Sequence, residues 1–567
     1  MREYKKYAWL GLLCIGVEVV LEITVPLLMA DLIDYGVTNA DGTYIIKKGL
    51  QMALCAVLAL ILGVGSAKFS ALAGQGLGAN IRKAEYEKLQ SYSFSNIDHF
   101  SVSSLVTRLT SDVTNIQNAV STGMRPFGRS PVMLIFATSF AFRINSTLAL
   151  VFLVALPTLA VLLILIIINV GPLYGRMQSA IDQVNRCIQE NLTAIRVVKS
   201  YVRGDYEVEK FGVVNENLKS ESEKAFGTAV LNMPAMQFVM YGTILGILLI
   251  GGRLINEGQM MIGQLTSFLS YVLLILNSLM MMSNVFLLMT RSLASAERIM
   301  EVIDEKIDIT DENAKDIAVA KGEIEFDHVW FKYKDTAKEY VLSDVSFHIK
   351  PGQTVGIIGQ TGSSKTTLVQ LIPRLYDVTK GEVKIDGINV KEYPVRHLRD
   401  AVAMVLQKNT LFSGSLIDNL RWGNENATLD EIKEACQIAC VDEFVERLAD
   451  GYDTEMGQEG VNVSGGQKQR ICIARAILKK PKVLILDDST SAVDTATEAK
   501  IRSGLAEKLP DMTKIVIAQR ISSVRHADQI IIMDRGHVEA IGTHESLLRD
   551  NQIYQEIYAS QKEGADL

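Results

Sequence analysis

Apolar residues gather in long runs through the part of the chain that precedes residue 290. A run of about 20 apolar residues is long enough to cross a bilayer as a helix. The runs predict six membrane-spanning helices, at 7–33, 49–72, 120–142, 148–170, 229–252 and 265–289. Arg125 and Arg129 interrupt the third run near its start. This part of the chain is therefore predicted to be an all-α, six-helix membrane domain.

The connections between these runs alternate in length. Those after the first, third and fifth runs are short, at 34–48, 143–147 and 253–264. Those after the second and fourth runs are much longer, are rich in Lys and Arg and have the composition of helices. Positively charged connections tend to stay on the cytoplasmic side of a membrane. We therefore expect both long connections and both chain termini in the cytoplasm, with helices that continue out of the bilayer.

The pattern changes after residue 290. Residues 291–316 are charged and helical in composition, and from Lys321 onward short apolar strands alternate with amphipathic helices. Such alternation is typical of an α/β domain. The predicted organisation is a transmembrane domain at 1–290, a linker at 291–320 and an α/β domain at 321–567.

Composition narrows the class of protein. The 567 residues are 48% hydrophobic and 21% charged, with a net charge of −7. These values exclude a disordered chain, a disulfide-rich secreted scaffold and a basic nucleic-acid-binding protein. The scattered cysteines form no metal-binding pattern and fit a reducing compartment. The basic N-terminus leads directly into the first apolar run, which fits a bacterial plasma membrane and leaves no room for a preceding peptidase domain.

A glycine-rich segment follows the predicted strand at 354–358. Its spacing is close to the phosphate-binding pattern G-x-x-x-x-G-K-[ST], with Ser364 at the second glycine. Backbone N–H groups of such a loop surround phosphate oxygens, while Lys365 neutralises their charge and the Thr366 hydroxyl binds Mg²⁺. A side chain at position 364 either crowds the nucleotide or imposes a different backbone angle. The predicted phosphate-binding residues are Gly359, Gln360, Thr361, Gly362, Ser363, Ser364, Lys365, Thr366 and Thr367.

Two further motifs bear on the same chemistry. The apolar run 483–486 ends in Asp487 and Asp488, the arrangement in which the first acid supports Mg²⁺ and the second lies near an attacking water. Between the phosphate loop and these acids, a Ser-Gly-Gly turn precedes a predicted helix, and a helix N-terminus is a second anion-binding position. The residues of this turn are Ser464, Gly465, Gly466 and Gln467.

Together these motifs, in this order, resemble the ATP-binding cassette (ABC) superfamily, and the whole chain resembles a type IV exporter half-transporter with one P-loop NTPase domain. The resemblance implies ATP and Mg²⁺ as cofactors. It implies that Tyr333 stacks on adenine, that Gln407 contacts Mg²⁺ and that Ser491 and Asp494 form the D-loop. It also implies that Ser464–Gln467 is the signature, which contacts the ATP of a partner's site.

The resemblance also implies that one chain cannot work alone. Two cassettes face each other, and each ATP lies between one P-loop and the other chain's signature. ATP binding closes the cassettes and turns the membrane halves from inward-open to outward-open, a population shift driven by ligand. The expected partner is a second half-transporter chain, and the expected surroundings are membrane lipid.

Two residues depart from the family pattern at the hydrolytic centre. Asp488 stands where the family has Glu, and its carboxylate is one methylene shorter. A general base must lie within hydrogen-bond reach of its water, and a misplacement of about 1 Å costs about 100-fold in rate. Gln519 stands where the family has a His, and an amide cannot carry a positive charge. We therefore expect a site that binds ATP and hydrolyses it poorly, as in the degenerate-site subunit of a bacterial heterodimeric multidrug exporter.

Three functions remain open at this point. The first is a heterodimeric exporter that moves amphipathic drugs, peptides or lipids outward. The second is a homodimeric lipid or peptide exporter with slow hydrolysis. The third is an ATP-gated channel or regulatory subunit, which binds nucleotide without pumping.

The first apolar run contains two acids, Glu18 and Glu22, which share one helix face. An ionisable group at membrane depth faces a cavity or a partner charge. These carboxylates are therefore either a cation-attracting surface in the substrate path or partners of Lys or Arg on a neighbouring helix.

Overall fold

The computed structural model describes residues 3–488 and 493–563. Its internal contacts divide the chain into two compact units, one formed by Met1–Gln90 and Ser103–Asp304, the other by Ser91–Val102 and Glu305–Leu567. The first unit is helical and the second combines helices with sheets, which confirms the predicted fold class. Each unit is described by itself below.

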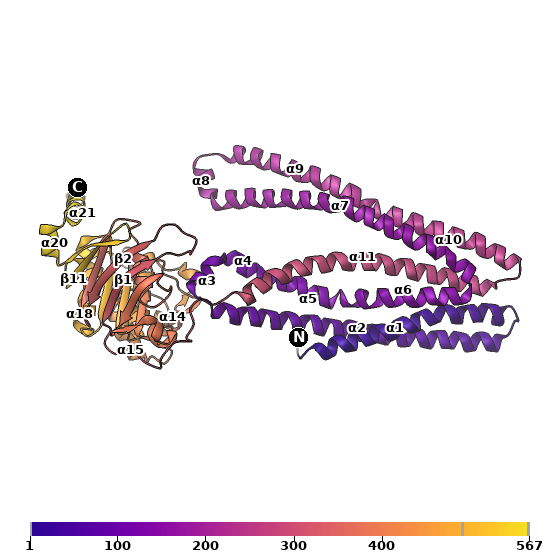
Figure 1. Cartoon of the computed structure of the whole chain (residues 1–567), viewed down its shortest axis with the longest axis horizontal. Coiled ribbons are helices and arrows are strands. Elements are labelled where there is room, and N and C mark those ends of the chain that lie inside the picture. The colour runs from indigo at the N-terminus through magenta and orange to yellow at the C-terminus, as the bar shows by residue number, and fades with distance from the viewer. Residues whose placement is uncertain (1–2, 489–492, 564–567) are drawn as a thin grey trace. The chain divides into compact units, whose positions relative to one another are not determined.

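Long helices form the first unit (Figure 1). They are α1 (Lys5–Asp31), α2 (Gly42–Gln90), α6 (Met124–Ile144), α7 (Ser146–Thr193), α9 (Gly204–Val230), α10 (Asn232–Asn256) and α11 (Ile262–Asp304). Short helices α4 (Val102–Thr107), α5 (Val113–Ser121) and α8 (Ile195–Ser200) connect them, with π-helical turns at Leu32–Val37 and Arg108–Asp112. Helices α2 and α7 have 49 and 48 residues. That length exceeds the roughly 20 residues needed to span a bilayer, so both helices continue beyond an apolar span, as predicted.

Within the described residues, five helical segments are long and apolar enough to cross a membrane. They are Lys5–Val37, Gly42–Gln90, Ser146–Thr193, Gly204–Asn256 and Ile262–Met282. The third predicted span coincides with α6, whose 21 residues include Arg125, Arg129 and Arg143. These arginines are the reason that composition does not mark α6 as a span. The sixth span therefore stays a prediction.

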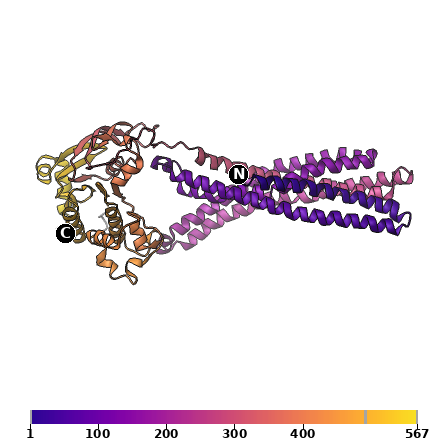
Figure 2. The same cartoon turned by 90° about the horizontal axis from the view of Figure 1, so that it is seen from below.

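Two groups of helices make up this unit. Figure 2 shows α1 and α2 lying along each other, and these helices pack together over much of their length. Helices α6 and α11 pack against α1, while α7 packs along α9 and α10. The buried core of the first group includes Ile15, Val19 and Met133. Apolar side chains form this core, and few charged side chains are buried in the helical unit.

The second unit is built on a six-stranded sheet of order β12-β11-β3-β10-β9-β6. All neighbours are parallel except β11 and β12. The strands are β3 (Thr354–Gly359), β6 (Val402–Val405), β9 (Val483–Asp487), β10 (Thr513–Ile517), β11 (Gln529–Asp534) and β12 (His537–Gly542). Every residue of β9 is buried, as its continuous apolar sequence predicts for a strand covered on both faces.

Smaller sheets complete the α/β unit. An antiparallel sheet of order β2-β1-β4-β5 contains β1 (Ile324–Phe331), β2 (Leu342–Ile349), β4 (Lys380–Ile385) and β5 (Ile388–Asn389). Strands β7 (Gly414–Ser415) and β8 (Glu455–Met456) form a short pair. The helices are α3 (Phe94–His99), α12 (Lys365–Gln370), α13 (Val395–Ala401), α14 (Leu416–Arg421), α15 (Leu429–Ile438), α16 (Asp442–Val445), α17 (Gly465–Leu478), α18 (Thr495–Lys508), α19 (Ile521–Val524), α20 (His544–Asp550) and α21 (Gln552–Glu563).

The parallel register determines where the polar loops lie. Ile517 of β10 is opposite Asp487 on one side and Ile357 of β3 on the other. The loops that follow β3, β9 and β10 therefore leave the sheet at the same edge. Ligands of open α/β sheets bind outside the carboxyl ends of such strands.

Candidate nucleotide-binding site

The phosphate loop connects β3 to α12 and contains a left-handed residue just before the helix. Ser364 has φ 70° and ψ 23°, and it precedes Lys365, the first residue of α12. This conformation favours glycine, which is the residue that the phosphate-binding pattern has at this position. Ser364 therefore adopts the left-handed backbone conformation that a glycine would have at this position, and the loop is slightly strained there.

Lys365 lies across this loop. Its ammonium group donates to the carbonyl oxygens of Gly359 and Gln360, both at 2.8 Å, and to Ser363 Oγ at 3.2 Å. Burial lowers the pKa of Lys365, while the nearby carboxylates of Asp488 and Asp487 raise it. The lysine charge is thus held inside the curve of the loop, where phosphate oxygens would bind.

Thr366 and Asp487 form a pair suited to a hard cation. The Thr366 hydroxyl donates to Asp487 Oδ1 at 3.0 Å. Asp487 is 1% exposed, and its Oδ2 has no hydrogen-bond partner in the part of the chain that the structure describes. Burial raises the pKa of Asp487, and the bond from Thr366 lowers it. A buried carboxylate oxygen beside a hydroxyl fits the oxygen ligands and waters that Mg²⁺ prefers.

Asp488 and Gln519, the two departures from the family pattern, contact each other. Gln519 Nε2 donates to Asp488 Oδ2 at 2.8 Å. Burial raises the pKa of Asp488, while hydrogen bonds from Gln519 and Gln407 and the charge of Lys365 lower it. The sequence places both substitutions at the hydrolytic centre without indicating a contact between them. The structure joins them, with the predicted ligand Gln407, around one carboxylate.

Tyr333 reaches the helix that follows the phosphate loop. Its hydroxyl oxygen is 2.8 Å from Thr367 Oγ1, and the residue is 44% exposed. Burial raises the pKa of Tyr333. A partly exposed tyrosine that is anchored at its hydroxyl can accept a stacked aromatic base.

Sequence reasoning missed two residues behind Tyr333. The Tyr376 ring meets the Tyr333 ring edge-on, with centroids 5.2 Å apart. Tyr376 also donates its hydroxyl to Asp98 Oδ2 at 2.6 Å, and its ring contacts Phe94 of α3. Asp98 and Tyr376 are 278 positions apart in the chain, so no local pattern marks the pair.

The turn at 464–467 forms a capping box. Ser464 Oγ accepts from the Gln467 backbone N–H at 3.3 Å, and Gln467 Oε1 accepts from the Ser464 backbone N–H at 2.8 Å. Gly465 and Gly466 open the 14-residue helix α17, whose N-terminus is exposed. The turn therefore presents backbone N–H groups at a surface, the arrangement that binds anions.

The two predicted D-loop residues have different outcomes. Asp494 caps α18 and accepts from the Thr497 backbone N–H at 2.9 Å, and this bond lowers the pKa of Asp494. Ser491 lies outside the described residues.

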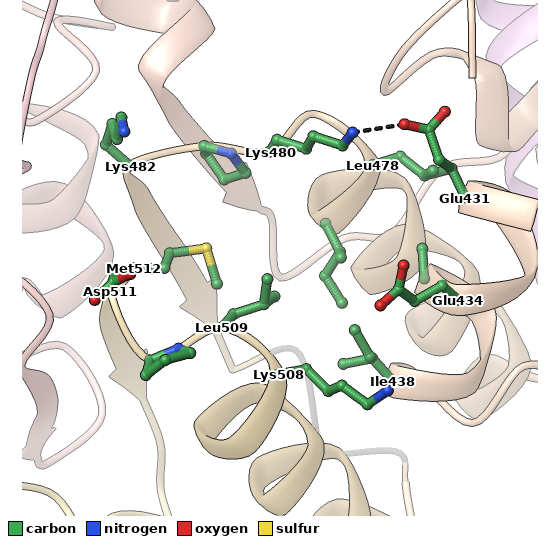
Figure 3. Close-up of a pocket in the computed structure, with 14 residues that line it drawn as sticks. Glu431, Glu434, Ile438, Leu478, Lys480, Lys482, Lys508, Leu509, Asp511 and Met512 are labelled. Carbon is green, nitrogen blue, oxygen red and sulfur yellow. Dashed lines mark hydrogen bonds and ion pairs between the residues drawn. The ribbon is translucent and has the colours of Figure 1, made fainter. Parts of the chain in front are cut away.

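A separate cavity of about 360 Å³ lies near the amino ends of β9 and β10 (Figure 3). Apolar side chains such as Leu478 and Met512 line it together with charged ones, among them Lys480, which contacts Glu431 at 2.6 Å. The predicted phosphate-binding residues do not line this cavity, because they follow the carboxyl ends of the strands. The nucleotide site is therefore distinct from it.

The two acids of α1 are paired with arginines of α6. Arg125 Nη2 donates to Glu18 Oε1 at 2.7 Å, and Arg129 Nη2 donates to Glu22 Oε1 at 2.7 Å. The alternative in which these carboxylates pair with a neighbouring helix is therefore the one observed. Both acids nevertheless line a cavity of about 750 Å³.

Comparisons with known proteins cover the whole chain. The family described as ABC transporter transmembrane region matches residues 8–279, and the family described as ABC transporter matches residues 342–491. The uncharacterized ABC transporter ATP-binding protein YfiB of Bacillus subtilis (strain 168) is 38% identical over 568 residues, covering 100% of this chain and 98% of that protein.

Relatives with functional names are also similar. The putative multidrug export ATP-binding/permease protein YgaD of Bacillus subtilis (strain 168) is 31% identical, with 99% of this chain and 98% of that protein covered. The ATP-dependent lipid A-core flippase of Pseudomonas putida is 32% identical, with 98% and 94% covered. Among solved structures, a bacterial Atm1-family ABC exporter with ATP bound has a TM-score of 0.83 and 24% identity, covering 99% of this chain and 98% of that one. That likeness shows a shared fold.

Proposed function

The chain belongs to the ABC transporter family, and from this premise we propose that it is one half of an ATP-driven exporter of amphipathic molecules. The observation that carries the proposal is the convergence of Lys365, Thr366 and Asp487 at one sheet edge, in a chain that also has membrane-spanning helices. Names of the relatives support drugs and lipids as substrate classes. As a multi-pass membrane protein, the chain would have both termini in the cytoplasm, with the nucleotide.

ATP and Mg²⁺ are the proposed cofactors. ATP would supply the phosphate charge that closes two cassettes, and Mg²⁺ would neutralise the β and γ oxygens. On the protein side, the Lys365 ammonium would exchange a loop carbonyl for a phosphate oxygen. Thr366 and Asp487 would hold the metal, with Gln407 as a further ligand, and Tyr333 would stack on the base.

Hydrolysis at this chain's own site is proposed to be slow. Asp488 is shorter than the Glu of the family, and Gln519 already donates to its carboxylate. An engaged, short carboxylate is poorly placed to take a proton from water. The phosphate and metal groups are nevertheless complete, so ATP binding would persist.

A second chain is proposed to complete each site. The turn at 464–467 is exposed at the start of α17, where it would face the phosphate loop of a partner. Apolar side chains next to α8 are also exposed, with Tyr201 at 75% and Val202 at 87%. Because this chain's own site is altered, we favour a different half-transporter as partner. A homodimer of this chain is the second candidate for the assembly.

The composition of the purified transporter tests this proposal. The tagged chain is expressed from its native locus, purified in detergent and weighed intact by native mass spectrometry. We expect one copy of this chain with one copy of a different half-transporter, and ATP-dependent accumulation of an amphipathic dye in inside-out vesicles. A complex of two copies with full ATPase activity would overturn the heterodimer. An ion conductance without vectorial transport would favour a channel.

A further inference from the structure

The cavity beside Glu18 lies among α1, α2, α6 and α11, within the helical unit. Its volume of about 750 Å³ lies within the range of roughly 300–1,000 Å³ that is usual for small-molecule sites. Most of its wall is apolar, with side chains such as Val25, Leu60 and Leu273. Glu18, Glu22 and Arg125 also line it, so the cavity combines an apolar body with a charged end.

The charges around this end sum to zero. Two carboxylates, Glu18 and Glu22, face two guanidinium groups, Arg125 and Arg129. Arg129 contacts both acids, at 3.3 Å to Glu18 Oε1 and 2.6 Å to Glu22 Oε2. Arg125 contacts Glu18 at 2.7 Å and keeps 40% of its side chain exposed. A ligand in the cavity would therefore meet both signs of charge, in a cluster without net charge.

Two carboxylate oxygens in the cluster lack a hydrogen-bond partner among the described residues, Glu18 Oε2 and Glu22 Oε2, although Glu22 Oε2 lies in ion-pair contact with Arg129. Glu18 is 5% exposed, and its Oε2 is buried without a hydrogen-bond partner among the described residues. A buried polar atom that lacks a partner is costly, above all at membrane depth. A ligand that donates a hydrogen bond or brings a positive charge to this oxygen would remove that cost.

A small residue gives the cluster its space. A Cβ at Gly63 of α2 would lie 3.2 Å from Glu18 Oε1 and 3.3 Å from Arg125 Nη2. Ala56, Ala59 and Ala67 line the cavity from the same helix. The residues that α2 contributes beside the charged groups are thus small, and they leave room for a head group there.

We propose that this cavity binds amphipathic molecules with a zwitterionic head group. The cationic part would lie against Glu18 and Glu22, the anionic part against the exposed guanidinium of Arg125, and the apolar tail along Leu60, Val64 and Leu274. A purely cationic ligand is attracted by the carboxylates and repelled by Arg125. An anionic ligand is attracted by Arg125 and repelled by the carboxylates. The inference names the substrate class of the proposed exporter, and it replaces the cationic class expected from the two acids alone.

Direct binding to the assembled transporter in nanodiscs, without nucleotide, tests the inference. The radiolabelled probes share a dodecyl chain and carry a phosphocholine, trimethylammonium, sulfate or glucoside head group, with empty nanodiscs as background. We expect the phosphocholine probe to bind roughly tenfold more tightly than each of the other three. Trimethylammonium binding as tightly as phosphocholine, or equal binding of all four probes, would overturn the inference.

Variants assign the recognition to the cluster. Glu18→Gln is expected to weaken phosphocholine and trimethylammonium binding, and Arg125→Gln to weaken phosphocholine and sulfate binding, with glucoside binding unchanged in both. Glu257→Gln is the matched control, because Glu257 pairs with Arg253 at the exposed end of α10. Equal loss for all head groups in either cavity variant would contradict the assignment. If a variant does not fold, the ranking of probes on the wild type still decides.

Binding without nucleotide also separates this inference from the proposed function. Preferred binding of phosphocholine without ATP-dependent transport would leave the site standing and reject the exporter. Transport without head-group preference would leave the exporter standing and reject the site.

Discussion

Asp488 and Gln519 are joined by a 2.8 Å hydrogen bond, so two substitutions that are 31 positions apart act on one carboxylate. The carboxylate that would receive a proton from water already accepts from an amide. The lysine, threonine and buried acid that would hold phosphate and metal are all in place. At the scale of single residues, these contacts support the proposal that the site binds ATP and hydrolyses it slowly.

The first prediction concerns the phosphate-binding lysine. We expect Lys365→Ala to weaken ATP binding at this chain's site about 10- to 100-fold, because charge-assisted hydrogen bonds contribute roughly 1.5–3 kcal/mol. ATPase activity of the assembled transporter should largely remain, because this site is proposed to contribute little hydrolysis. Nucleotide photolabelling of each chain, with ATPase assays beside it, measures both quantities. Collapse of activity equal to that from the partner's matching change would indicate two working sites.

The second prediction concerns the catalytic acid. Asp488→Glu alone should leave hydrolysis at this site well below that of a competent site. Gln519 remains in place of the family's His, and an amide cannot carry a positive charge. Asp488→Glu with Gln519→His should restore substantially more than either change alone. Turnover is measured with the partner's catalytic acid disabled. Full turnover from the single change would identify the missing methylene as the sole defect.

The third prediction concerns the strained loop residue. Ser364→Gly should raise the stability of the α/β unit or its affinity for ATP, since a left-handed serine costs roughly 1 kcal/mol. Thermal unfolding with and without ATP measures the effect. Ser503→Gly, on the helix α18, is the matched control and should be destabilising by roughly 0.5 kcal/mol. A loss of stability at position 364 comparable to that control would show that the serine is not strained.

At the scale of elements, α3 and α6 carry the contacts that the sequence pattern did not reveal. Helix α3 contacts the rest of the α/β unit through Asp98 and Phe94, both on Tyr376, which in turn meets Tyr333. Helix α6 brings its two arginines to the acids of α1. The contacts that α3 and α6 themselves make each join segments more than a hundred positions apart, so hydrophobic periodicity, which reports local structure, has no signal for them.

The fourth prediction concerns α3. Tyr376→Phe keeps the ring and removes the bond to Asp98, so ATP binding should be unchanged while stimulation of ATPase activity by substrate falls. Tyr340→Phe, which keeps its ring contact with Trp330, is the control. ATPase activity in proteoliposomes, with and without substrate, gives the ratio. Equal stimulation in wild type and Tyr376→Phe would show that the contact between α3 and Tyr376 is not needed for substrate to stimulate ATPase activity.

The fifth prediction concerns the pairing of α1 with α6. Arg129→Ala should destabilise the helical unit by about 1–3 kcal/mol, because it removes the arginine that pairs with half-buried Glu22 and one of the two that contact buried Glu18. Adding Glu22→Gln should recover part of the loss. Thermal unfolding in nanodiscs measures both. Lack of any recovery in the double variant would contradict an ion pair between these residues.

At the scale of the whole molecule, the α/β unit was more predictable than the helical one. The strand before Gly359 and the buried strand before Asp487 are marked by continuous apolar residues and by the glycine and acids that follow them. The span at α6 was less certain, because Arg125 and Arg129 obscure its apolar pattern until their partners on α1 are known. The role of Tyr376 and the hydrogen bond between Asp488 and Gln519 could not be predicted, since both depend on tertiary contacts.

The central claim is that this chain's own ATP site binds nucleotide and hydrolyses it poorly within a two-chain exporter. The most direct measurement is to trap the assembled transporter with vanadate during turnover, crosslink a photoreactive ATP analogue and identify the nucleotide on each chain by mass spectrometry. We expect intact triphosphate crosslinked to this chain and diphosphate trapped on the partner. Diphosphate trapped on this chain at the partner's rate, or in a complex of two copies of this chain, would contradict it.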